Sequence, residues 1–328
     1  MTLNRRQVIQ GAGGALLGGA AASGAWAQSA GYPDRPIRLV VPWGSGSNGD
    51  IAMRLLAPRM SQILGQQVVV DNKAGATGVM GSEQVTRAAP DGYTLLMASI
   101  ASHSTIVPLS PKLPYNVARD FSYIGGATST PAVIVVTPSV PARDLKEFVA
   151  WTKTQPRGVD YASSGLGGSG HLATEMFRLK TGASLVHVPY KEAGRAVTDL
   201  AAGVCKMMIY YASVVPLVRS GQLRALAVMS DQRMSGLPDV ATTEEQGFKG
   251  MTVSAWTGLM APLGLPDPIR DKVFAALRTA VLDPALKPNL VAQGLEPFAL
   301  PPAEFKRFVE GDITKWTEVV RVAGIKME

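Results

Sequence analysis

The sequence predicts an α/β protein built from two lobes. Short apolar, β-branched runs alternate along the chain with longer segments in which apolar residues recur every three or four positions. This alternation is typical of sheets that are covered by helices on both faces. The chain has 328 residues, a length that favours two domains, and no stretch of linker composition separates them. A missing linker is expected where the chain passes between two domains more than once.

Strands are expected where a short apolar run is rich in β-branched residues and bounded by polar residues or glycine. These runs are 37–42, 68–71, 94–98, 132–137, 159–162, 185–188, 204–210 and 223–229. Helices are expected where the apolar residues follow helical periodicity, and a proline at position 302 suits the first turn of the last one. These segments are 50–64, 81–88, 145–154, 171–180, 192–202, 269–282 and 302–323.

The division into lobes follows from a continuous run at 254–262, which is expected to be a strand passing from one lobe to the other. On this interpretation residues 28–128 and 252–328 form lobe 1, and residues 129–251 form lobe 2. The chain then crosses twice between the lobes. A ligand cleft is expected between them, with hinge closure on binding.

The most informative segment is loop 1, residues 43–48, which joins the first expected strand to a helix that Asp50 opens. The first N–H groups of a helix have no partner inside the helix, and the helix dipole adds positive potential there. Gly44 and Gly46 let the backbone approach a ligand closely, and the serines add hydroxyl donors. Loop 1 is therefore predicted to bind an anion.

Two other interpretations of this segment are open. Gly44, Gly46 and Gly49 spell the dinucleotide fingerprint G-x-G-x-x-G, and the acidic Asp71 follows roughly 20 residues later. A bulky Trp43 and the negative charge of Asp50 weigh against a pyrophosphate at this place. The segment is also compatible with a purely structural turn in which Asp50 caps the helix.

Loop 2, residues 163–169, has the same design. It follows the expected strand 159–162, precedes the expected helix 171–180, and consists of serine, glycine and one leucine, without Lys or Arg. Two uncharged loops at helix starts, one in each lobe, are expected to face each other across the cleft and to hold an anion from both sides.

Residues 1–27 are predicted to be an export signal. Arg5 and Arg6 precede a short apolar region, and Ala25-Trp26-Ala27 forms a cleavage site, so cleavage is expected after Ala27. The paired arginines resemble a twin-arginine signal, with a Sec signal as the alternative. The mature protein is therefore expected in the periplasm.

The composition excludes several classes of protein. The formal net charge is +7, but the basic residues are scattered, which argues against nucleic-acid binding. The only cysteine, Cys205, excludes an intramolecular disulfide and a cysteine metal cluster, and is expected to be buried and inert.

Catalytic equipment is sparse. His103, His171 and His187 lack the spacing of metal ligands, and no G-x-S-x-G elbow surrounds the serines of loop 2. His171 is expected to pack or to form a hydrogen bond near a helix start, and His187 is expected to be structural. We therefore predict a binding protein without metal or cofactor, not an enzyme.

Several short segments resemble one known family in their order and spacing. They are Tyr32-Pro33, the segment 42–50, Asn72-Lys73-Ala74-Gly75, residues 89–95, 112–115, 161–165, 187–191, 223–228 and 237–240, and Lys315-Trp316. The chain resembles the Bug-type solute-binding receptors of tripartite tricarboxylate transporters. The similarity extends through nearly the whole mature chain.

The resemblance implies a two-lobed periplasmic binding protein fold with two crossovers, of the type II kind. It also implies a small carboxylate ligand, held between loops 1 and 2 partly through water, and delivery to a membrane permease of one large and one small subunit. No cofactor is implied, and a monomer is expected. The expected ligand-binding residues are Trp43, Gly44, Ser45, Gly46, Ser47, Asn48, Ser99, Ser163, Ser164, Gly165, Gly168, Ser169 and Tyr210.

Departures from the family pattern bear on the ligand. Ser47 replaces a common glycine, and Ile209 stands where the family often has an acidic residue. An ammonium group buried without an acidic partner is costly, so an amino-acid ligand is disfavoured. Trp43 and one of Tyr210 and Tyr211 are expected to line the cleft, which favours a dicarboxylate without an amino group, aromatic rather than short-chain.

Two other functions are open from the sequence. An exported α/β oxidoreductase would use the G-x-G-x-x-G loop for a dinucleotide. A sensor component would present its ligand to a membrane kinase, with the same fold and site as a transport receptor.

Overall fold

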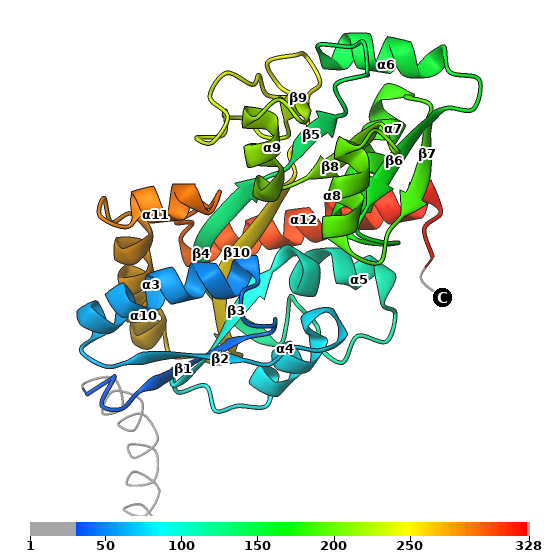
Figure 1. Cartoon of the computed structure of the whole chain (residues 1–328). Helices are drawn as coiled ribbons and strands as arrows, with labels where there is room; N and C mark the ends of the chain where they lie inside the picture. Colours follow the sequence, from blue (N-terminus) through cyan, green and yellow to red (C-terminus); the bar gives the residue numbers. More distant parts are fainter. Residues whose placement is uncertain (1–30, 327–328) are drawn as a thin grey trace, which may run out of the picture.

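A computed structural model describes residues 31–326, which form two mixed sheets flanked by helices (Figure 1). The export signal predicted for residues 1–27 lies outside the described residues. The first sheet has the strand order β11-β4-β10-β3-β1-β2, and the second has the order β7-β6-β8-β5-β9. The strands are β1 (Ile37–Val41), β2 (Val68–Asn72), β3 (Thr94–Ser99), β4 (Phe121–Pro131), β5 (Val133–Val136), β6 (Val159–Ser163), β7 (Leu185–Pro189), β8 (Met207–Tyr210), β9 (Arg224–Val228), β10 (Ser254–Pro262) and β11 (Glu296–Pro297).

Both sheets combine parallel and antiparallel pairs. β1 pairs in parallel with β2 and β3, and β6 pairs in parallel with β7 and β8. β10 runs antiparallel to β3 and β4, and β5 runs antiparallel to β8 and β9. The parallel parts are the strands that lead into helices through loops, and they carry loops 1 and 2.

The helices begin and end where the sequence provides the local signals. Glycines in the left-handed conformation terminate α3, α7 and α12, and prolines occupy the first turns of α10 and α12. In residues 31–326, none of these helices combines the length and the apolar character that a membrane crossing requires. The helices are α3 (Asn48–Leu64), α4 (Val79–Thr86), α5 (Ile106–Leu109), α6 (Leu145–Lys153), α7 (Ser169–Thr181), α8 (Ala193–Ala201), α9 (Val215–Arg219), α10 (Asp267–Val281), α11 (Lys287–Ala292) and α12 (Pro302–Ala323), with short turns η1 (Ala76–Gly78), η2 (Ala101–Thr105, a π-helix) and η3 (Ala212–Val214).

The chain passes between the sheets at two adjacent places. β4 continues into β5 through Ala132, and the return path reaches β10 through Val253. The Ala132 amide donates to the Val253 carbonyl (2.9 Å), the Val253 amide to the Met229 carbonyl (2.9 Å), and the Met229 amide to the Ala132 carbonyl (2.8 Å). These bonds hold the crossing segments side by side. We propose the lobe boundaries near residues 128 and 252, and a hinge at this junction.

Helix α12 contacts both halves of the molecule. It packs on β4, η2 and α5, and also on α7, which covers the second sheet (Figure 1, red). Trp316 of α12 is fully buried in an apolar cluster that also holds Phe148 and Phe177. The last helix therefore ties the second sheet to the first.

Strand β4 is the main element that sequence patterns did not predict, because Gly125 and Gly126 interrupt its apolar run. A Cβ at Gly126 would lie 2.3 Å from the Phe298 carbonyl oxygen, and a Cβ at Gly125 would lie 2.5 Å from the Phe274 ring. The two glycines thus allow the 298–300 segment and α10 to approach the strand closely.

Candidate functional site

Loops 1 and 2 occupy equivalent places in the two sheets. Loop 1 joins β1 to α3, and loop 2 joins β6 to α7, so both follow the carboxyl end of a parallel strand and precede a helix. Ligands of open α/β sheets bind outside these ends of the strands. The strand, loop and helix order predicted from the sequence is therefore present twice.

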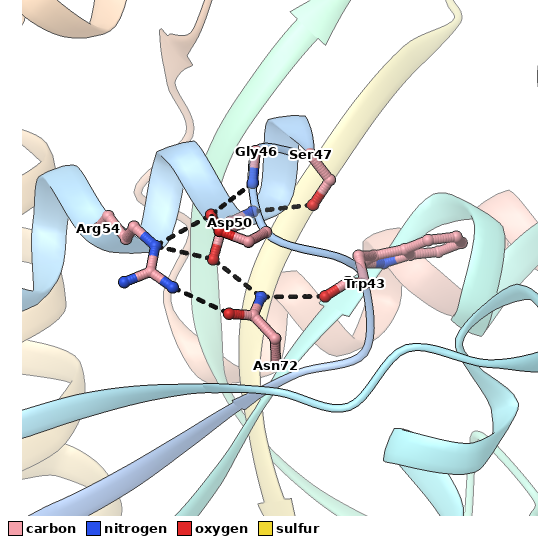
Figure 2. A network of polar contacts seen from close by, with 7 residues as sticks. Trp43, Gly46, Ser47, Asp50, Arg54 and Asn72 are labelled. Carbon is pink, nitrogen blue, oxygen red and sulfur yellow. Dashed lines mark hydrogen bonds and ion pairs between the residues drawn. The ribbon is translucent and has the colours of Figure 1, made fainter.

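Loop 1 is folded around the carboxylate of Asp50, whose side chain is 2% exposed (Figure 2). The Gly46 amide and the Asn72 side-chain amide each donate to this carboxylate at 2.8 Å, and Arg54 forms an ion pair with it at 3.0 Å. Burial raises the pKa of Asp50, but the hydrogen bonds from Arg54, Gly46 and Asn72 outweigh that effect and lower the pKa. Asp50 is therefore ionised at neutral pH.

This arrangement changes what loop 1 can offer to a ligand. The Gly46 amide donates to the Asp50 carboxylate at 2.8 Å, and the Ser45 hydroxyl donates to it at 3.5 Å. A pyrophosphate at this helix start would meet the ionised carboxylate of Asp50 and would find the Gly46 amide already occupied. The geometry thus argues against the dinucleotide interpretation.

The cap of α3 differs from the one predicted. Ser47, not Asp50, is the N-cap residue, and its hydroxyl oxygen accepts from the Asp50 amide at 3.3 Å. Asp50 lies in the first turn, where its charge suits the helix dipole. The Ser47 oxygen acts as an acceptor, so its own proton remains free for a ligand. Asn72 also donates to the Trp43 carbonyl at 2.9 Å, which fixes the start of loop 1.

A cavity of about 490 Å³ lies beside loop 1, between the start of α3, the η3–α9 segment and α11. This volume suits a small ligand. Arg219 of α9 brings a positive charge to its wall, and two guanidinium nitrogens of Arg219 donate to the Gly236 carbonyl at 3.2 and 2.9 Å. The wall is otherwise largely apolar, and it is formed by Asn48, Ala212, Ser213, Val215, Pro216, Arg219, Met234, Gly236, Pro288, Val291, Ala292, Gln293 and Gly294.

In loop 2 the serines lie in different environments. Ser163 is fully buried, and its Oγ lies 2.6 Å from Nε2 of His187 and accepts from the Gly165 amide at 3.2 Å. Ser164 and Ser169 are partly exposed, as are Gly165 and Gly168. Ser164 and Ser169 are therefore the serines of loop 2 that keep exposed surface, whereas the Ser163 hydroxyl is used inside the protein.

Two stacked imidazoles lie beneath loop 2. The rings of His171 and His187 are 4.0 Å apart between centroids and 5° from parallel. Nδ1 of His171 accepts from the Gly167 amide at 3.0 Å, which confirms the hydrogen-bonding role predicted for it near a helix start. Burial, with a smaller contribution from His187, lowers the pKa of His171 to about 4, and burial also lowers the pKa of His187. Both rings are neutral at pH 7.

The remaining predicted residues lie in two other places. Ser99, at the end of β3, is 7% exposed, and its Oγ lies 3.0 Å from that of Ser102. Tyr211 is buried in the core, and within residues 31–326 its hydroxyl has no hydrogen-bond partner. Tyr210 keeps part of its surface exposed, so it is the tyrosine of this pair that can present its ring to solvent.

Arg219 and the structural use of Asn72 were not predicted from the sequence. Arg219 belongs to the short helix α9, which carries a proline and has no extended periodic pattern. Asn72 lies two residues after the apolar run 68–70, in a segment that resembles the family. This location is the sequence feature that could have identified it.

Comparisons with known proteins agree with this geometry. The model of the tripartite tricarboxylate transporter family receptor matches residues 52–325. Protein BugT of Bordetella pertussis is 36% identical over 299 residues, which cover 90% of this chain and 92% of BugT. Two solved structures are similar: R. palustris Rpa4515 with adipate (31% identity, 90% and 99% of the two chains, TM-score 0.75) and MatC (Rpa3494) from Rhodopseudomonas palustris with bound malate (30% identity, 88% and 100%, TM-score 0.71).

The two sheets, the paired crossings and the similar structures define a two-lobed periplasmic binding protein fold. The chain belongs to the tripartite tricarboxylate transporter receptor family, the family of the Bug proteins. It is therefore a solute-binding receptor by family, and the resemblance inferred from its short segments is confirmed.

Proposed function

We propose that this receptor captures a small dicarboxylate without an amino group between loops 1 and 2. The family membership supports this most strongly, because similar receptors are described with adipate and with malate. Both of these ligands are dicarboxylates that lack an ammonium group.

The chemistry of the two loops supports an anion. Each loop precedes the start of a helix of more than eight residues, where amide groups and the helix dipole favour negative charge. The Ser47 hydroxyl proton in loop 1 and the exposed hydroxyls of Ser164 and Ser169 in loop 2 add donors. Arg219, on the wall of the adjoining cavity, provides a cation for a second carboxylate.

Side chains near both loops support the absence of an amino group. Ile209 is 1% exposed and apolar, so position 209 supplies no negative charge to an ammonium. The carboxylate of Asp50 is already paired with Arg54. Trp43 and Tyr210 are both partly exposed, and stacking on their rings would favour a ligand with a planar body; aromatic stacking contributes about 0.5–1.5 kcal/mol beyond buried area.

The further steps are also part of the proposal. The protein is exported to the periplasm, its signal peptide is cleaved after Ala27, and the mature chain acts as a monomer that closes about the junction of its two crossings when the ligand binds. It then delivers the ligand to a membrane permease of one large and one small subunit.

A thermal-shift screen of the purified mature protein tests the proposal. The panel contains adipate, malate, succinate, citrate, terephthalate, aspartate, glutamate and NAD. A ligand at about 100 times its Kd adds about 2.7 kcal/mol to the free energy of unfolding, which raises Tm by several degrees. We expect stabilisation by dicarboxylates without an amino group. Stabilisation by NAD alone rejects the receptor function, and stabilisation by glutamate or aspartate alone rejects the ligand class.

A further inference from the structure

We propose that His171 and His187 are positioning residues, which hold loop 2 in its binding shape only while His171 is neutral, so that acid releases the loop. The effect on ligand binding rests on the proposed function, since it requires loop 2 to contact the ligand. The effect on the loop itself does not require a ligand.

The anchor is the hydrogen bond between the Gly167 amide and Nδ1 of His171, at 3.0 Å. An amide can donate only to an unprotonated ring nitrogen, so this bond requires a His171 that carries no proton on Nδ1. Protonation turns Nδ1 into a donor and places two N–H groups against each other. Gly167 is buried, so its amide then loses its acceptor without gaining water in place.

The second imidazole supports the first by stacking and by holding the start of the loop. His187 lies 4.0 Å from the His171 ring, and its Nε2 lies 2.6 Å from Ser163 Oγ. Ser163 Oγ in turn accepts from the Gly165 amide. His187 thus holds the Gly165 end of the turn through the Ser163 hydroxyl, and His171 accepts directly from the Gly167 amide at the other end.

The backbone of this turn depends on such anchors. Gly165 has φ 122° and Gly167 has φ 72°, and both conformations favour glycine. Because glycine restricts the backbone little, the turn can move when no hydrogen bond holds it. Leu166, between them, is 52% exposed and packs little of the turn onto the core. Loss of the Gly167 bond therefore releases the segment that carries Ser164 and Ser169.

Titratable and charged groups from β6, β7 and α7 surround the two imidazoles. Tyr161 of β6 stacks on His187 at 4.8 Å and donates its hydroxyl to Glu175 of α7 at 2.8 Å. Glu175 favours a protonated imidazole, but Arg178 pairs with it at 2.7 Å and offsets its charge. Each histidine disfavours charge on the other, and burial disfavours charge on both. Burial outweighs the effect of Glu175, so the pKa of both imidazoles is lowered, that of His171 to about 4.

The first experiment follows the loop without any ligand. Protein labelled with ¹⁵N-glycine is titrated by NMR from about pH 7.5 to about pH 3.5, with the Gly167 signal assigned by its absence from Gly167→Ala. We expect the Gly167 amide signal to move with a midpoint near the pKa of His171, about 4. In His171→Asn, whose Oδ1 can take the place of Nδ1 but does not titrate in this range, the signal stays in place. A Gly167 signal that moves identically in both proteins, or that does not move in the parent, overturns the proposal.

The second experiment separates positioning from simple structure at neutral pH. Binding of adipate is compared in the parent, His171→Ala and His171→Asn. Because the alanine leaves a buried amide without an acceptor, we expect it to weaken binding by about tenfold or more, and the asparagine to restore most of the affinity. Equal affinity in all three proteins overturns the positioning role. If adipate does not bind the parent, the comparison is made with malate, and the Gly167 titration still decides the proposal about the loop.

Discussion

At the scale of single residues, the structure assigns Asp50 an internal role. Its carboxylate accepts hydrogen bonds from loop 1 and from Asn72, and it pairs with Arg54. The sequence alone permitted three interpretations of this loop, because a glycine-rich turn before a helix suits a dinucleotide, a carboxylate or no ligand. The buried, ionised carboxylate of Asp50 argues against the dinucleotide, and its position depends on Asn72, which is distant in sequence.

Asp50→Asn is expected to lower the free energy of unfolding by about 1–3 kcal/mol, since it weakens several hydrogen bonds to a buried charged acceptor. Urea unfolding of both proteins measures the difference. Asp267→Asn is the matched control: Asp267 also lies in the first turn of a helix and pairs with an arginine, but its side chain is 76% exposed, so we expect a smaller loss. An Asp50→Asn protein as stable as the parent contradicts the assigned role of the carboxylate.

The buried histidines predict how stability depends on pH. The folded pKa of His171 is about 4 and that of His103 about 3, both lowered by burial from 6.5. The unfolded chain therefore binds more protons below pH 6.5, and the free energy of unfolding falls as the pH falls from 6.5 toward these values. Above about pH 7 the histidines add no pH dependence. Chemical unfolding at a series of pH values measures this, and constant stability between pH 6.5 and 4 contradicts it.

Arg219→Gln tests the cation on the wall of the cavity. We expect binding of a dicarboxylate to weaken by about tenfold, as a hydrogen bond to a charged group contributes about 1.5–3 kcal/mol. Arg195→Gln is the control, because Arg195 is exposed on α8, pairs with Asp199 and does not line the cavity. If both variants bind like the parent, the second carboxylate does not reach Arg219.

At the scale of elements, periodicity predicted the longer helices, and a continuous run predicted the strand 254–262, which the structure has as β10 (Ser254–Pro262). It did not predict β4, because the need for glycine at positions 125 and 126 comes from Phe274 and Phe298, which are distant in sequence. The cavity was not predicted for the same reason. Residues of α3, α9 and α11 form its wall, and these helices are distant from one another in sequence or separated by other elements. Loops 1 and 2 were predictable because each is defined by its own strand and helix.

Gly126→Ala tests the close approach at β4. A Cβ there would lie 2.3 Å from the Phe298 carbonyl, so we expect a loss of about 1–3 kcal/mol in the free energy of unfolding. Gly311→Ala is the matched control, since nothing lies within 4 Å of a Cβ at that position in α12, and alanine favours a helix by about 1 kcal/mol. Equal effects of the two substitutions contradict the packing described for β4.

At the scale of the whole molecule, the two crossing segments lie side by side, whereas loops 1 and 2 follow strands of different sheets. Rotation about the hydrogen-bonded junction of Ala132, Met229 and Val253 would change the distance between loops 1 and 2. Helix α12 contacts β4 of the first sheet and α7, which covers the second sheet, and it limits the directions of that movement. Capture of a ligand between two loops is therefore the task that this architecture suits.

Calorimetric titration of the mature parent and of Ser47→Asp with adipate, malate, terephthalate and glutamate tests the central claim most directly. We predict that the parent binds at least one of the three dicarboxylates that lack an amino group. We also predict that Ser47→Asp abolishes this binding, because it places a negative charge at the loop that meets the ligand. Binding of a dicarboxylate with equal affinity by both proteins, or binding of glutamate alone, contradicts the account.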